Sequence, residues 1–225
     1  VHSEKLGAIG KLSASIAHEF NNPIFSIKSA LEEISEDVEM DKGSAGLLDI
    51  AVKECDRIAR LTRSLQDFNR PSLDIFEAID IHKAIDEILL LSRKNIKAKN
   101  IELCLNYDKH LPEVEVVPDQ FKQVVLNMLQ NAEEAIDQGG SLTITTEQVN
   151  SSANISISDT GCGIPPDIMK NIFEPFFTTK SAVKGTGLGL SVCHGIVELH
   201  GGEIKIDSRT NQGTTVTLVF PLRRN

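Results

Sequence analysis

The spacing of apolar residues in the first third of the chain constrains the fold most. Over residues 6–38 these positions recur at steps of three and four, with one step of seven, as in a helix that buries a narrow stripe. Residues 40–44 interrupt the repeat, and a second stripe covers residues 47–68. The pattern predicts two helices, the first ending near Glu39 and the second capped by Ser44.

Two amphipathic helices joined by a short turn form a hairpin, which cannot hide both of its apolar stripes from water. Two hairpins side by side solve this problem by forming a four-helix bundle. The sequence therefore predicts a homodimer through residues 1–69.

A second domain is expected after Pro71, because proline cannot continue a helix and the periodicity changes there. We place a linker at residues 70–75 and the domain at residues 76–225. Helices are expected at residues 81–97 with Asp80 as cap, 121–136 with Asp119 as cap and Gly139–Gly140 as stop, and 188–200 with Gly201–Gly202 as stop. Strands are expected at 101–105, 114–116, 142–149, 155–158, 203–207 and 214–220. The predicted fold class is α+β, a helical hairpin followed by an α/β sandwich.

Composition narrows the classes of function. Acidic residues outnumber basic ones by 32 to 23, for a formal net charge of −9, and no basic cluster suggests a nucleic-acid partner. The apolar runs are far shorter than the ~20 residues that span a bilayer, so we expect no membrane contact by this segment. The four cysteines show no metal-like or paired spacing, which predicts reduced packing residues and a cytoplasmic setting. Without a start methionine or a signal peptide, the chain is expected to be part of a longer protein.

The first candidate site is His18 with Glu19, in the first predicted helix. At 100° per residue, His18 lies about 200° from its apolar neighbours, on the water side of the bundle. Glu19 could orient the imidazole or accept its proton, and Asn22 lies one turn on, on the same face. Asn22 stands where the zinc motif H-E-x-x-H needs its second histidine, so that motif is excluded. An exposed histidine alone is also typical of an ordinary solvated surface.

Two further candidates lie in the second domain. Asn127 and Asn131 are four residues apart on one helix face, where amide oxygens can bind Mg²⁺ and amide N–H groups can donate to phosphate. Asp159 ends a predicted strand and precedes Gly161 and Gly163, and its carboxylate could accept from the exocyclic amine of a purine. Taken alone, the two asparagines are weak evidence for a metal or phosphate site. The segment from Asp159 to Gly163 could equally be a tight turn.

The last candidate is a glycine-rich segment, residues 180–190, that opens a helix. Glycines at 185, 187 and 189 allow the backbone to approach phosphates, and a helix N-terminus favours negative charge. The spacing fits neither G-x-G-x-x-G nor G-x-x-x-x-G-K-[ST], so the Rossmann and Walker interpretations both fail. We expect the aromatic side chains just before it to anchor a mobile lid in the core: Phe173, Phe176 and Phe177.

Together these segments resemble the transmitter region of a sensor histidine kinase of two-component signalling, over nearly the whole chain. Its ATP-binding part resembles the superfamily of gyrase, Hsp90, histidine kinases and mismatch-repair proteins. The matching motifs are the H box at residues 18–23, the N box at 127–132, the first glycine box at 159–163, the F box at 173–177, the second glycine box at 185–189 and a last nucleotide-contacting element at 213–215.

The resemblance implies an ATP-dependent autokinase that passes its phosphoryl group to an aspartate of a response regulator. His18 would be the phosphoacceptor, Glu19 its base or orienting partner, and Asn22 would hold the water that dephosphorylates the regulator. Histidine offers a neutral nitrogen near neutral pH, as this chemistry requires. A sensor domain would precede this region, and the full-length protein could be anchored in a membrane.

The resemblance also implies a nucleotide site. Asn131, aided by Asn127, would hold Mg²⁺ and the phosphates; Asp159 would select adenine, and Thr214 would assist through water. Further nucleotide contacts are implied for Gly161, Gly163, Lys180, Gly185, Gly187, Leu188 and Gly189. The segment before Gly185 is short, so the phosphate contact of Lys180 could instead belong to Lys184.

Two other functions compete with this interpretation. An ATPase of the gyrase and Hsp90 type would carry a water-activating glutamate where Asn127 stands, and would lack the histidine-bearing hairpin. A non-catalytic dimerisation module would bind nucleotide without phosphorylating itself. Incubation with γ-labelled ATP separates these possibilities.

Overall fold

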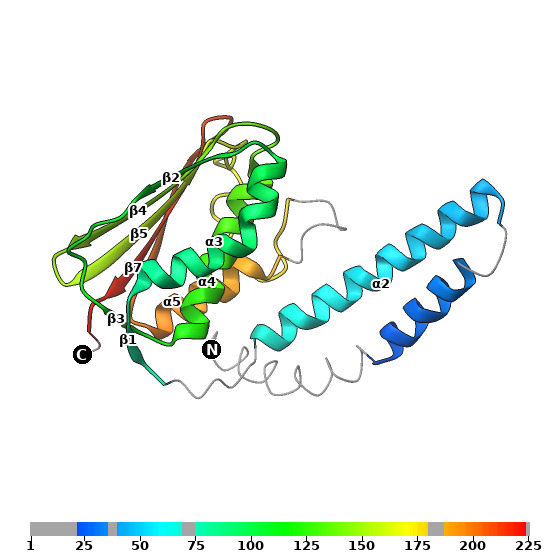
Figure 1. Ribbon diagram of the computed structural model, residues 1–225, viewed down its shortest axis with the longest axis horizontal. Helices are drawn as coiled ribbons and strands as arrows, with labels where there is room; N and C mark the ends of the chain where they lie inside the picture. The colour runs from blue at the N-terminus through cyan, green and yellow to red at the C-terminus, as the bar shows by residue number, and fades with distance from the viewer. Residues whose placement is uncertain (1–21, 36–39, 69–74, 180–186, 224–225) are drawn as a thin grey trace. The chain divides into compact units, whose positions relative to one another are not determined.

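The computed structural model describes residues 22–35, 40–68, 75–179 and 187–223, without the side chains of residues 57 and 60–68. The chain divides into two compact units, residues 1–72 with 175–189 and residues 73–174 with 190–225. Figure 1 shows the helices and strands of both. Within the described ranges, no helix is long and apolar enough to cross a bilayer.

The first unit contains the predicted pair of helices, residues 22–35 and α2 (Lys42–Phe68) (Figure 1). An ion pair joins them, since Lys28 Nζ donates to Asp56 Oδ1 at 2.7 Å, and this hydrogen bond raises the pKa of Lys28. The predicted end of the first helix near Glu39 lies outside the described residues.

Asp41, not Ser44, caps α2. Its Oδ1 accepts from the backbone N–H groups of Gly43 at 2.8 Å and Ser44 at 3.1 Å, and its Oδ2 accepts from the Ser44 hydroxyl at 2.6 Å. The prediction of Ser44 as cap was wrong because the nearby carboxylate satisfies the free N–H groups first and uses the serine as a donor.

The helices of the first unit leave many apolar side chains uncovered. Ile24 and Cys55 are buried, whereas Phe25 is 72% exposed, Leu47 70% and Ile50 58%. Apolar surface of this kind on a helical pair suits packing against further helices.

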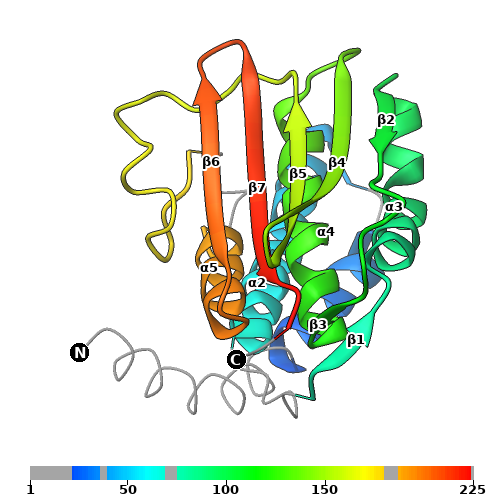
Figure 2. The same cartoon turned by 90° about the vertical axis from the view of Figure 1, so that its left-hand side faces the viewer.

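The second unit is a five-stranded mixed sheet with helices on one face (Figure 2). The strand order is β2-β4-β5-β7-β6; β2 is parallel to β4 and the other neighbours are antiparallel. The five strands are β2 (Glu102–Asn106), β4 (Ser141–Val149), β5 (Ser152–Asp159), β6 (Glu203–Arg209) and β7 (Gly213–Pro221). The covering helices are α3 (Ile81–Ala98), α4 (Pro118–Ala135) and α5 (Gly189–Leu199), and a small separate ladder pairs β1 (Glu77–Ile79) with β3 (Val114–Val116).

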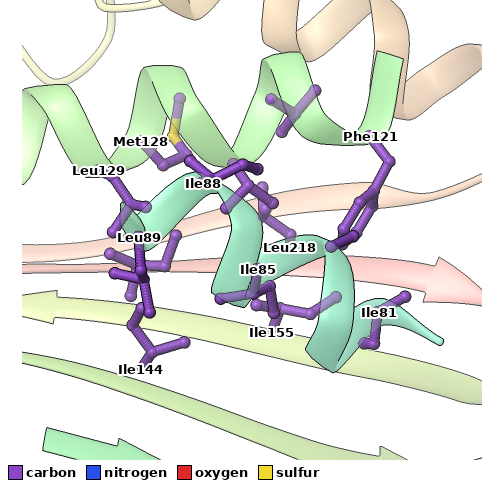
Figure 3. Close-up of a cluster of buried hydrophobic side chains, with 14 of the residues drawn as sticks. Ile81, Ile85, Ile88, Leu89, Phe121, Met128, Leu129, Ile144, Ile155 and Leu218 are labelled. Carbon is purple, nitrogen blue, oxygen red and sulfur yellow. The ribbon is translucent and has the colours of Figure 1, made fainter. Parts of the chain in front are cut away.

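The core lies between the sheet and the helices, as the predicted sandwich requires. Side chains of β5 alternate between buried and half-buried, so one face of the strand meets the helices. Figure 3 shows the residues that fill this space: Ile81, Ile85, Ile88 and Leu89 of α3, Phe121, Met128 and Leu129 of α4, and Ile144, Ile155 and Leu218 of the sheet. The ring of Phe121 meets that of Phe220 edge-on at 5.5 Å.

Several details differ from the predictions. Helix α4 begins at Pro118 after Val117, and Asp119 lies in its first turn instead of capping it. The helix ends at Ala135, before Gly139, because Ile136 is already extended. Strand β1 was not predicted, since its sequence Glu-Ala-Ile has one large apolar side chain and therefore shows no alternation.

The four cysteines are all free. Cys55 and Cys193 are buried, as expected for packing residues. Cys104 and Cys162 are exposed, so the packing role predicted for these two was wrong.

Candidate functional site

Asp159, the last residue of β5, is a buried carboxylate at the centre of the candidate site. Only 9% of its surface is exposed. Burial raises its pKa, while hydrogen bonds from the backbone N–H groups of Gly161 and Thr214 oppose that rise. The Gly161 N–H lies 2.8 Å from Oδ1. A carboxylate so held presents hydrogen-bond acceptors to any donor that enters the site.

Asp159 and Thr214 are neighbours although they lie far apart in the sequence. They face each other in the register of β5 and β7. Thr214 is also 9% exposed. Before it, Gly213 has φ of +93°, and a Cβ there would lie 1.9 Å from the Asp159 carbonyl oxygen. Only glycine lets the two backbones come this close.

The glycines that follow Asp159 are also required by close backbone approaches. A Cβ on Gly161 would lie 2.5 Å from the carbonyl oxygen of Ala135, and one on Gly163 would lie 2.0 Å from that of Arg209. Gly163 has φ of +67°. The loop is thereby fixed against the end of α4 on one side and the β6–β7 turn on the other. Packing within the protein thus explains both glycines before any ligand is considered.

Asn127 and Asn131 lie one turn apart on α4, and both are half-buried. The Asn127 amide donates to the sulfur of Cys193 on α5, while burial raises the pKa of that thiol to about 12. The thiol therefore stays neutral, and the Asn127 carbonyl oxygen is left as an acceptor. Among the described residues no group of three histidines, cysteines or carboxylates could hold a metal ion. Asn127 and Asn131 instead suit an Mg²⁺ ion that is bound by few protein oxygens and takes its other ligands from phosphate and water.

The second glycine-rich segment is described from Gly187 onward. Gly187 has φ of +68°, and its carbonyl oxygen accepts from the N–H of Phe176 at 2.9 Å. A Cβ there would lie 2.3 Å from the Phe176 carbonyl carbon. Leu188 is buried, and Gly189 begins α5, whose N-terminal end favours negative charge.

The three phenylalanines before this segment do not act alike. Phe173 and Phe177 are half-buried, and neither belongs to the buried core; the ring of Phe173 lies 5.0 Å from that of His194. Phe176 is 63% exposed with φ of +68°, so its predicted role as a core anchor was wrong. Phe176 contacts Gly187 through its backbone N–H, which donates to the Gly187 carbonyl oxygen, and not through a buried ring.

Four predicted site residues lie outside the described part of the chain: His18, Glu19, Lys180 and Gly185. The alternative phosphate contact, Lys184, lies outside it too. Asn22 is described; it is exposed at the start of residues 22–35, and its carbonyl oxygen accepts from the Ser26 hydroxyl at 3.1 Å.

The sequence does not predict the contacts that two further residues make with the candidate site. The sequence predicts Cys193 only as a packing residue, yet its sulfur accepts a hydrogen bond from the Asn127 amide. Ser208, on β6, contacts Thr214 through a hydroxyl–hydroxyl distance of 2.8 Å. A serine on an alternating strand gives no signal of such a contact, because strand pairing decides its neighbours.

Two family models match the chain. The His Kinase A (phospho-acceptor) domain matches residues 8–73. The histidine kinase-, DNA gyrase B- and HSP90-like ATPase matches residues 116–224, which include Asp159 and Thr214.

Individual proteins match as well. The sensor histidine kinase ZraS of Escherichia coli strain K12 is 37% identical over 219 residues, which are 97% of this chain and 47% of ZraS. The chain thus spans about half the length of this relative. The solved catalytic domain of histidine kinase ThkA is 36% identical, with a TM-score of 0.60 over 65% of this chain and 97% of that one. The structure of ThkA in complex with response regulator protein TrrA is 28% identical, with a TM-score of 0.72 over 98% of this chain and 64% of that one.

Proposed function

This chain belongs to the sensor histidine kinase family, and we propose that it transfers the γ-phosphoryl group of ATP to its own His18. The observation that carries the proposal is the buried Asp159 carboxylate, held beside Thr214 within an ATP-binding domain. Its acceptor oxygens suit the 6-amino group of adenine, which donates. Guanine places an accepting 6-oxo group at the same position.

The phosphates are proposed to bind at the N-terminal end of α5 and at the amide side chains of Asn127 and Asn131. Asn127 and Asn131 would hold Mg²⁺, which neutralises phosphate charge when bound. The backbone N–H groups of residues 187–189 would donate to phosphate oxygens. Gly161, Gly163 and Gly185 would let the chain approach the nucleotide, and Lys180 would supply a positive charge.

In the transfer itself, a neutral ring nitrogen of His18 attacks the γ-phosphorus. The bond from that phosphorus to the bridging oxygen of ADP breaks, and ADP leaves. Glu19 accepts the proton that the imidazole loses, or holds the ring in the attacking orientation. The description of residues 8–73 as a phospho-acceptor domain supports His18 as the acceptor.

We propose that the phosphoryl group then passes to an aspartate of a response regulator. The complex of ThkA with response regulator protein TrrA supports a partner of this class. Asn22, which is exposed and stands four residues after His18 in the sequence, would position the water that later hydrolyses the regulator's phosphoaspartate.

We also propose a homodimer through residues 1–69, a linker at 70–75 and a nucleotide-binding domain at 76–225. The exposed Phe25, Leu47 and Ile50 support a helical partner for the hairpin. The region would work in the cytoplasm and receive its signal from a sensor domain.

Incubation with γ-labelled ATP tests the proposal. The chain should acquire a label that is stable in base and labile in acid, and EDTA should prevent labelling. His18→Gln should abolish the label while nucleotide binding persists, whereas His110→Gln, which changes an exposed histidine of the second unit, should leave it unchanged. Label retained in His18→Gln would mean that another residue is the acceptor. Nucleotide binding without any label would favour a non-catalytic module.

A further inference from the structure

The hydroxyl of Ser208, on β6, contacts three residues from two other segments around the candidate base site. Its Oγ accepts from the N–H of Ile164 at 2.8 Å, donates to the carbonyl oxygen of Gly213 at 3.1 Å, and lies 2.8 Å from Thr214 Oγ1. Ile164 lies in the loop after Asp159, and Gly213 and Thr214 begin β7. Ser208 therefore connects the two segments that hold the Asp159 carboxylate.

The number of protons on the Ser208 hydroxyl determines which hydroxyl donates in its contact with Thr214. A serine hydroxyl has one proton and two acceptor positions. The Ile164 N–H occupies one acceptor position, and the Gly213 carbonyl, which can only accept, takes the proton. All three contacts are hydrogen bonds at once only if the Thr214 hydroxyl donates its proton to Ser208. Thr214 Oγ1 is then left with acceptor positions alone.

We propose that Ser208 is a positioning residue for base specificity, which keeps the Thr214 hydroxyl from donating to the base. This rests on the proposed function, in which Asp159 and Thr214 meet adenine. With Ser208 in place, the carboxylate and the hydroxyl both present only acceptors to the base edge. A 6-oxo purine then finds no donor there.

Removing Ser208 frees the proton of Thr214. The hydroxyl can then rotate and donate to the 6-oxo group of guanine, directly or through a water molecule. The 6-amino group of ATP, which needs an acceptor, gains nothing from the rotation. One added hydrogen bond should tighten GTP binding by roughly 3- to 10-fold. A purely structural role for Ser208 would instead weaken ATP and GTP alike and leave their affinity ratio unchanged.

The test measures dissociation constants of ATP and GTP for the full chain, by displacement of the fluorescent analogue TNP-ATP. Ser208→Ala should lower the preference for ATP over GTP by roughly 3- to 10-fold, mainly through tighter GTP binding. The matched control is Ser156→Ala, which removes a similar hydroxyl pair with Thr217, 3.0 Å apart in the same sheet. The control should keep the wild-type ratio.

A second background shows whether Ser208 acts through Thr214. Thr214→Val removes the hydroxyl but keeps the shape, so Ser208→Ala should not change the ratio further in this background. If Ser208→Ala fails to fold, Ser208→Cys carries the same prediction, because a thiol accepts and donates only weakly. An unchanged ratio in the single variant, or an equal drop in the Thr214→Val background, would overturn the role of Ser208. Wild-type protein that binds no ATP would overturn the proposed function itself.

Discussion

Replacing Asp159 by asparagine separates the two properties of this buried carboxylate, its acceptor geometry and its charge. The side chain accepts from Gly161 N–H at 2.8 Å and from Thr214 N–H, and its remaining acceptor capacity is proposed to meet the adenine amine. An amide has only one acceptor atom. When that oxygen accepts from the Gly161 N–H, the NH₂ group of the asparagine lies opposite the adenine amine. Both groups are donors, so no hydrogen bond forms between them.

The loss of ATP affinity follows from this mismatch. A hydrogen bond to a charged acceptor contributes about 1.5–3 kcal/mol, so Asp159→Asn should weaken ATP binding by roughly 10- to 150-fold. Asp207→Asn is the control, since it makes the same charge change at an exposed position of β6. Titration of both variants with ATP in a calorimeter measures the difference. Equal affinity in Asp159→Asn and the wild type would refute the adenine contact.

The same variant has a second readout in the pH dependence of stability. Burial raises the pKa of Asp159 above its ordinary value, so the folded chain binds more protons than the unfolded chain between the two values. The contribution of this carboxyl to stability is complete below its ordinary pKa and is lost as pH rises through the raised one. Asparagine does not titrate, so the melting temperature of the variant minus that of the wild type should increase with pH. A difference that stays constant from pH 4 to pH 8 would contradict the burial argument.

Two further predictions concern the helical hairpin. Asn22→Ala should leave autophosphorylation near the wild-type rate but slow dephosphorylation of the cognate regulator at least severalfold, because Asn22 is exposed and is proposed to position only the hydrolytic water; a parallel loss of both activities and of melting temperature would mean that Asn22 stabilises the helix. A fragment of residues 1–69 should sediment as a dimer, since Phe25, Leu47 and Ile50 are exposed in the single hairpin; a folded monomer would contradict the bundle.

Local patterns predicted the elements of this chain well. The period of the apolar residues located the helical pair, α3 and α4, and alternation located β4 and β7. The cap of α2 was misplaced because Asp41 and Ser44 are both good capping residues, and only the geometry shows that the carboxylate accepts.

The candidate site was predictable as a set of residues but not as an arrangement. The sequence predicts Asp159 and Thr214 as two separate candidates, and their adjacency depends on the register of β5 and β7, which no local pattern contains. The partners of Asn127 and Thr214, Cys193 and Ser208, were invisible for the same reason. They come from other elements and become neighbours only when the sheet and helices assemble.

The position of β7 has a consequence for the order in which the protein acquires function during synthesis. This strand is the last of the sheet in the sequence, yet it lies between β5 and β6 and supplies both Gly213 and Thr214 beside Asp159. A ribosome makes Asp159 before β7, so the carboxylate has no Thr214 N–H to accept from until β7 has been made. A product released early, before Gly213, retains the hairpin but has no completed base site. Such a fragment could still join a hairpin bundle, where it would compete with complete chains without being able to select ATP.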